Sequence, residues 1–158
     1  MVDNYLKIPE FINIVDSINK RNFLDANLKL DSLISKDKDS YFLNNIKGVI
    51  LLNLGDLNNA EIFLKKSINL NINFIEAYSN LGTVFFLKKN FLESIKNFEH
   101  CVNAGEKLDY YYLNIANCYR ELNNFDDSLK FFGTFCSPIK TFHSFGNAPI
   151  KLSLVHLN

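Results

Sequence analysis

The residue types that most often take part in catalysis or metal binding are few in this chain of 158 residues. The three histidines, His100, His143 and His156, have none of the spacings that bind metal ions. His100 and Cys101 are adjacent, so on a helix their side chains point about 100° apart and do not converge on one ligand. We therefore expect no metal site.

The three cysteines, Cys101, Cys118 and Cys136, contain no C-x-x-C pair, and their odd number fits a reducing, cytoplasmic setting without disulfides. Cys118 and Cys136 have no histidine or carboxylate in phase, and Cys101 suits a small, buried core position. The sequence has no glycine-rich phosphate loop and no G-x-S-x-G motif. We expect neither an enzyme activity nor a cofactor.

The composition is that of an ordinary folded domain, with 47% hydrophobic and 22% charged residues. Lysine plus arginine and aspartate plus glutamate each number 17, and no dense basic run occurs, which argues against nucleic acid as a partner. No secretory signal is visible, and the apolar runs at 49–52 and 84–87 are too short to cross a bilayer. We expect no membrane partner.

Small and apolar residues recur with a period of 34 residues, which indicates repeated helical units. One small position is occupied by Gly48, Gly82 and Ala116. A second small position, and the apolar position four residues after it, recur in all four units as Ala26, Ala60, Ser94 and Ser128, and as Leu30, Leu64, Phe98 and Phe132.

This pattern resembles the tetratricopeptide repeat, W-x2-L-G-x2-Y followed by A-x3-F. Residues 78–85 read YSNLGTVF, and residues 94–98 read SIKNF. The second repeat departs from the pattern at Asn44 and Lys47, and the first has Ile14 at the small position. The proline that usually ends each repeat is missing.

The resemblance implies an all-α fold, a right-handed α-solenoid of antiparallel helix pairs. We expect the array over residues 1–136, with a degenerate first repeat at about 7–40, serving as a cap, and further repeats at 41–74, 75–108 and 109–136. In the third repeat, helix A is predicted at about 75–88 and helix B at about 91–104. Small residues at 82 and 94 let the two helices approach closely.

Residues 137–158 form an irregular tail, because Pro138, Gly146 and Pro149 interrupt any further helix. Two interpretations stay open. The tail folds back over the apolar face of the last helix, or it is the truncated or frame-altered end of a longer array. If that face stays uncovered, self-association through the C-terminal end of the stack is a further expectation.

Helix A residues that do not pack against other helices are expected to be exposed and to line the concave face of the array. These candidate peptide-binding residues are Asn45, Val49, Ser79, Asn80, Thr83, Phe86, Tyr110, Asn114, Asn117 and Arg120.

Asn80 and Asn114 occupy equivalent positions one repeat apart, and an amide can both donate to and accept from a peptide backbone. They are similar to the asparagine ladder in repeats of the O-linked N-acetylglucosamine transferase family. Ile12 and Ile46 interrupt that ladder, and the general abundance of asparagine is an alternative explanation.

The family's carboxylate clamp of Lys, Asn and Arg is not matched, because its first-repeat positions hold Phe11 and Val15. The resemblance therefore implies a protein-interaction scaffold that binds a peptide segment in its concave groove. The alternative is the N-terminal array of a larger bacterial enzyme, of the glycosyltransferase or sulfotransferase type.

Overall fold

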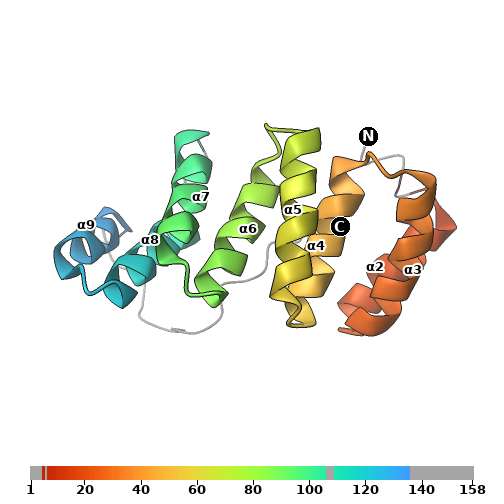
Figure 1. The fold of residues 1–158 in the computed structure, drawn as a ribbon, viewed down its shortest axis with the longest axis horizontal. Helices are drawn as coiled ribbons and strands as arrows, with labels where there is room; N and C mark the ends of the chain where they lie inside the picture. The colour runs from red at the N-terminus through yellow and green to blue at the C-terminus, as the bar shows by residue number, and fades with distance from the viewer. Residues whose placement is uncertain (1–4, 6, 106–108, 136–158) are drawn as a thin grey trace. The chain divides into compact units, whose positions relative to one another are not determined.

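The structure, a computed structural model, describes residue 5, residues 7–105 and residues 109–135. These form helices joined by short turns, with no β-strand among them (Figure 1). The predicted tail at 137–158 lies outside the described residues, as do Cys136, His143 and His156. The helices are α2 (Pro9–Asn19), α3 (Phe23–Lys36), α4 (Tyr41–Asn53), α5 (Leu57–Leu70), α6 (Ile75–Leu87), α7 (Phe91–Asn103), α8 (Asp109–Glu121) and α9 (Phe125–Phe135).

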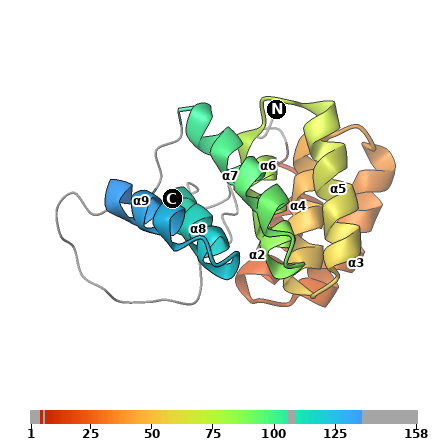
Figure 2. The same ribbon diagram turned by 60° about the vertical axis from the view of Figure 1, so that its left-hand side comes forward.

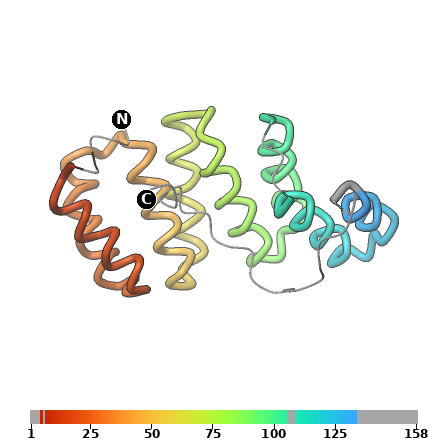
Figure 3. The backbone as a smooth tube through the Cα atoms, turned by 180° about the vertical axis from the view of Figure 1, so that it is seen from behind, coloured from red at the N-terminus to blue at the C-terminus, as the bar shows by residue number. Residues whose placement is uncertain are grey.

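Consecutive helices form antiparallel pairs, as the backbone tube makes clear (Figure 3). The chain divides into two compact units, Met1–Ala77 and Tyr78–Asn158, which are described separately. The first unit contains α2–α3 and α4–α5, and the second contains most of α6 together with α7, α8 and α9. The bounds of α6 and α7 agree with the predicted helices to within one residue, and the all-α solenoid of helix pairs is confirmed.

Helices A and B of a pair meet at the two small positions. In the second unit the Ser94 hydroxyl donates to the Gly82 carbonyl oxygen at 2.8 Å. One repeat later, Ser128 donates in the same way to the Ala116 carbonyl oxygen at 2.9 Å. A side chain larger than methyl at Gly82 or Ala116 would push helix B away and break this bond. The prediction of a close approach at these positions is therefore confirmed.

The turn between helices A and B also repeats in the backbone. Its central residue has a positive φ in every pair, at Arg21, Gly55, Lys89 and Asn123. The next residue caps helix B, and in three of the pairs its side chain accepts a hydrogen bond from the backbone N–H three residues later. These caps are Asn22 to Asp25 (3.3 Å), Asp56 to Asn59 (3.2 Å) and Asn124 to Asp127 (3.3 Å).

The two departures of the second repeat have structural roles. The Lys47 side chain is buried, pairs with Asp31 of α3, and lies 5.9 Å from the centre of the Phe63 ring. The Asn44 amide donates to the carbonyl oxygens of Ser40 at 2.7 Å and Lys38 at 3.2 Å. These polar residues therefore fix α4 against its neighbours within the first unit.

We expect the substitution Gly48→Ala to destabilise the protein by about 1–3 kcal/mol, through overpacking. An added Cβ would lie 2.5 Å from Leu64 Cγ and 2.7 Å from Leu64 Cδ2, and Leu64 is fully buried. Gly82→Ala should be nearly neutral, since contacts of 3.0–3.1 Å with the Phe98 ring offset a helix-propensity gain of about 1 kcal/mol. Urea denaturation followed by circular dichroism measures both, and a Gly48→Ala variant as stable as the parent would contradict the packing.

We expect Lys89→Gly to stabilise the protein by about 0.5–1 kcal/mol, because Lys89 holds a left-handed backbone with φ of 59°. The control is Lys96→Gly, an exposed lysine inside α7, which should destabilise by about 1 kcal/mol. Thermal denaturation of the two variants should show shifts of opposite sign. A lower melting temperature for Lys89→Gly would mean that the turn is not strained.

Candidate functional site

The inner-face candidates of the second unit lie on α6 and α8. The hydroxyl groups of Ser79 on α6 and Tyr110 on α8 are 2.7 Å apart and hydrogen bonded. The rings of Tyr110 and Tyr111 are 4.2 Å apart, and the buried Tyr111 ring lies 6.2 Å from that of Phe98. The inner positions of two consecutive A helices therefore meet within this unit, whose helices are drawn in green to blue (Figure 2).

Other candidates in this unit are partly exposed. The Thr83 hydroxyl donates to the Ser79 carbonyl oxygen at 3.2 Å, and the Phe86 ring packs edge-on against Phe91 at 5.7 Å. Asn114 and Asn117 are half-buried. Among the described residues, the Asn117 Oδ1 atom is buried and has no hydrogen-bond partner.

The charge on this inner face is small. Arg120 is the one charged residue among the candidates, and its guanidinium lies 3.4 Å from the carboxylate of Glu121. Both side chains are nearly half exposed, so the pair is well solvated and contributes little to stability. The surface offers amide, hydroxyl and aromatic groups rather than a charged field.

The prediction that all the candidates are exposed is wrong for four of them. Asn80 is 2% exposed and Asn45 is 1% exposed, and Ser79 and Val49 are also buried. Ser79 is covered by its contact with Tyr110, and Asn45 and Asn80 both have interaction partners. The reason is that the inner face was counted on each helix alone, whereas neighbouring helices cover its edges.

In the first unit, α4 shows this effect along its whole length, because every residue from Phe42 to Leu52 is buried. The Phe42 ring packs at 5.8 Å against Phe11 of α2, and the Tyr41 carbonyl accepts from Ser67 of α5 at 2.7 Å. Asn45 and Val49 therefore belong to a helix enclosed by others, and we assign them no exposed binding surface.

The cysteines and His100 make packing contacts. Cys101 and Cys118 are free thiols and fully buried, as expected for Cys101. Burial raises the pKa of the Cys118 thiol to about 11, and the thiol donates to the Ser94 hydroxyl at 3.3 Å. The His100 ring stacks on Tyr78, with ring centres 3.8 Å apart. At neutral pH, Cys118 is a neutral thiol and a poor nucleophile.

Two searches of the described residues give negative results. Their histidine, cysteine, aspartate and glutamate side chains form no group of three that could hold a metal ion. None of the described helices is both long enough and apolar enough to span a membrane.

The tetratricopeptide repeat model matches residues 43–72 and 110–135, which cover α4–α5 and α8–α9. The chain therefore contains tetratricopeptide repeats. The other two pairs share the 34-residue period of the second small position and of the turns, although the family model matches neither of them. No curated protein sequence matches the chain.

Solved structures show the same fold. One crystal structure of MamA has a TM-score of 0.74 and 21% identity, over 85% of this chain and 75% of that one. MamA from Desulfovibrio magneticus RS-1 has a TM-score of 0.76 and 14% identity, over 80% of this chain and 72% of that one. YrrB, described as a tetratricopeptide repeat protein with an unusual peptide-binding site, has a TM-score of 0.61 and 19% identity, over 67% of this chain and 55% of that one.

The family therefore supports a protein-interaction scaffold, while the details of the site come from this chain. The Ser79–Tyr110 hydrogen bond was missed by sequence reasoning, although both residues were candidates. Their positions in successive A helices differ within the repeat, so the period alone does not bring them together. A model of how consecutive A helices stack would have been needed.

We expect the thiols of Cys101 and Cys118 to be unreactive in the folded protein, because both are buried. In a Cys136→Ser background, a thiol-reactive dye at pH 8 should modify neither residue until denaturant unfolds the chain. Stopped-flow absorbance gives the rate, which should follow unfolding. Modification at the rate of a free thiol peptide would contradict the structural role assigned to these residues.

Proposed function

We propose that this tetratricopeptide repeat protein binds an extended peptide segment along the inner face of α6 and α8. The observation that carries the proposal is the hydrogen bond between Ser79 and Tyr110, which joins the two helices into one surface. A peptide lying across that surface could contact both helices at once. The fold-level resemblance to YrrB, which is described as having an unusual peptide-binding site, is in keeping with this proposal.

The chemistry of the surface suits a peptide backbone. Asn114 and Asn117 lie one turn apart on α8 and present amides that can both donate and accept. The Asn117 Oδ1 atom has no partner among the described residues, so a side-chain rotation that turns it towards a peptide N–H would remove the penalty of about 1–3 kcal/mol for a buried, unsatisfied acceptor. Phe86 offers a partly exposed ring for an apolar side chain of the peptide.

The proposal predicts that replacing both Asn114 and Asn117 with alanine weakens peptide binding by about tenfold or more, since each lost hydrogen bond is worth about 0.5–1.5 kcal/mol. Peptides selected from a random phage-displayed library against the parent protein provide the probe, and fluorescence anisotropy measures the affinity. The matched control is Asn103→Ala, an exposed asparagine at the end of α7, which should leave the affinity unchanged.

Because the candidate surface holds little charge, the affinity should change only slightly between low and high salt. Equal binding by the parent and the double variant would show that the amides have no role. A steep loss of affinity with added salt would place the binding surface elsewhere. Circular dichroism of the double variant confirms that folding is retained, as expected for two half-buried residues.

The alternative, that this array precedes the catalytic domain of a larger enzyme, uses the same inner face. In that case its ligand would be a segment of the enzyme's protein substrate or of the enzyme itself. The peptide experiment tests the binding surface in both cases.

A further inference from the structure

The last described helix has an exposed apolar face. Leu129 of α9 is 69% exposed, and Phe125, one turn earlier, is also largely exposed. Leu122, in the turn before α9, extends the same face. Their spacing of three and four residues places them on one side of the helix. Large apolar side chains that share one exposed face mark a surface for association.

Comparison with α7, one repeat earlier, indicates which kind of contact this face of α9 is suited to make. The residue 34 positions before Leu129 is Ile95 of α7, which is only 5% exposed. On the same side of α7, the Phe98 ring packs against Tyr111 of the following helix, α8, at 6.2 Å. The corresponding face of α9 therefore has the form of a helix-packing surface, with no following helix among the described residues.

The other end of the array is different. On α2, five positions that correspond to buried residues of α4 are exposed, and they hold Pro9, Glu10, Ile12, Asn13 and Asp16. The Asp16 carboxylate pairs with Lys20 at 2.7 Å, and both side chains are solvated. An apolar face docked there would remove these charges from water at considerable cost. The α9 face of one copy is therefore poorly matched to the α2 face of another.

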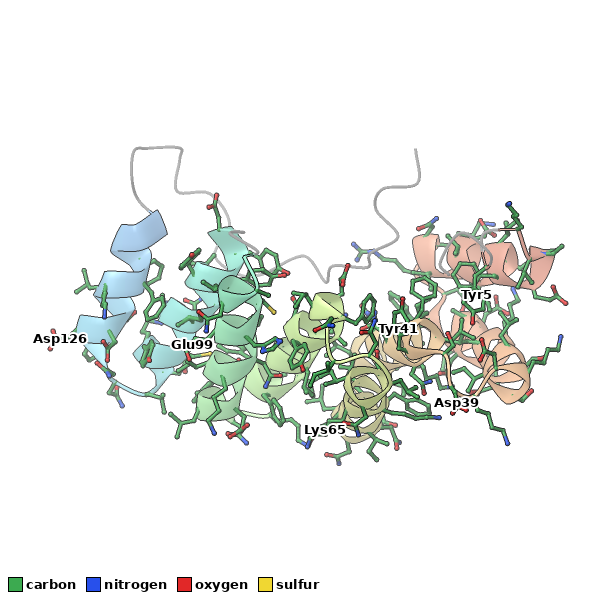
Figure 4. The ribbon with its side chains drawn as sticks, turned by 90° about the horizontal axis from the view of Figure 1, so that it is seen from above. Tyr5, Asp39, Tyr41, Lys65, Glu99 and Asp126 are labelled. Atoms are coloured by element: carbon green, nitrogen blue, oxygen red, sulfur yellow. The ribbon has the colours of Figure 1, made fainter. Side chains whose placement is uncertain are left out.

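We propose that two copies of this chain associate through their α9 faces, with Phe125 and Leu129 in contact across a twofold axis. Such an interface uses the same patch on both copies and closes at a dimer. The two helices run antiparallel, because the acidic first turns, which contain Asp126 and Asp127, then lie at opposite ends of the interface. Asp126 lies on the side of α9 away from α8 (Figure 4).

The dimer is expected to be weak. A helix of 11 residues offers a small patch, below the size of about 800 Å² per partner that stable complexes use. The dissociation constant should therefore be in the micromolar range or weaker. Association of this kind does not depend on the peptide surface proposed above, so each can fail without the other.

Analytical ultracentrifugation of the full chain, from about 1 µM to about 500 µM, tests the proposal. The weight-average mass should rise from 18.2 kDa towards twice that value. Leu129→Lys should remove the rise while keeping the native circular dichroism, because Leu129 is exposed. Leu92→Lys on α7, with Leu92 61% exposed on another B helix, is the matched control and should still dimerise.

Three results would overturn the proposal. The first is a mass of 18.2 kDa for the full chain at every concentration. If deleting residues 138–158 then makes the chain dimerise, the tail covers the α9 face in the full chain, which also overturns the proposal. The second is an equal effect of Leu129→Lys and Leu92→Lys, which would place the contact elsewhere. The third is growth of the mass beyond a dimer, which would indicate open-ended stacking.

Discussion

The close approach of helices A and B at a pair of small residues is the constraint on which the rest of the structure depends. Gly82 and Ser94 form one such pair, and the Ser94 hydroxyl donates a hydrogen bond to the Gly82 carbonyl oxygen at 2.8 Å. A glycine within a helix costs about 1 kcal/mol relative to alanine, and here the contact with the Phe98 ring explains its presence. With the helices this close, the large side chains lie above and below the crossing point, where they contact the next pair.

The turn follows from the same constraint. Two antiparallel helices in contact must be joined by a short connection, and this chain reverses direction with one left-handed residue followed by a helix cap. Glycine occupies the left-handed position only at Gly55, while Arg21, Lys89 and Asn123 adopt it at some cost. That non-glycine residues accept this conformation in three repeats indicates that helix packing, rather than local preference, determines the turn.

Most of the fold could be predicted from the sequence, because the period of small residues is a consequence of this packing. Positions 82 and 94 alone predict where α6 and α7 meet, and the helix bounds follow from the turn residues between them. The residues that precede the B helices, at 22, 56, 90 and 124, can be identified from the sequence in the same way. Each is an asparagine or aspartate directly after the left-handed residue of the turn.

The candidate site was less predictable, for a physical reason. The face on which a residue lies follows from its position on one helix, but its exposure depends on what the neighbouring helices cover. Asn80 and Asn114 are equivalent in the repeat, yet Asn80 is buried and Asn114 is half-buried. The 34-residue period does not reveal how consecutive A helices stack on one another. This stacking brings Ser79 into contact with Tyr110.

Residues on the inner face differ more between repeats than the residues at the second small position do. The position two before the small residue is Ile12, Ile46, Asn80 or Asn114, so the fold tolerates both an apolar side chain and an amide there. At the second small position only alanine and serine occur, because any larger side chain would separate the helices. Packing therefore limits the second small position more strictly than the inner face. A difference between repeats on that face needs another cause, and contact with a partner is one that the tetratricopeptide repeat fold can supply.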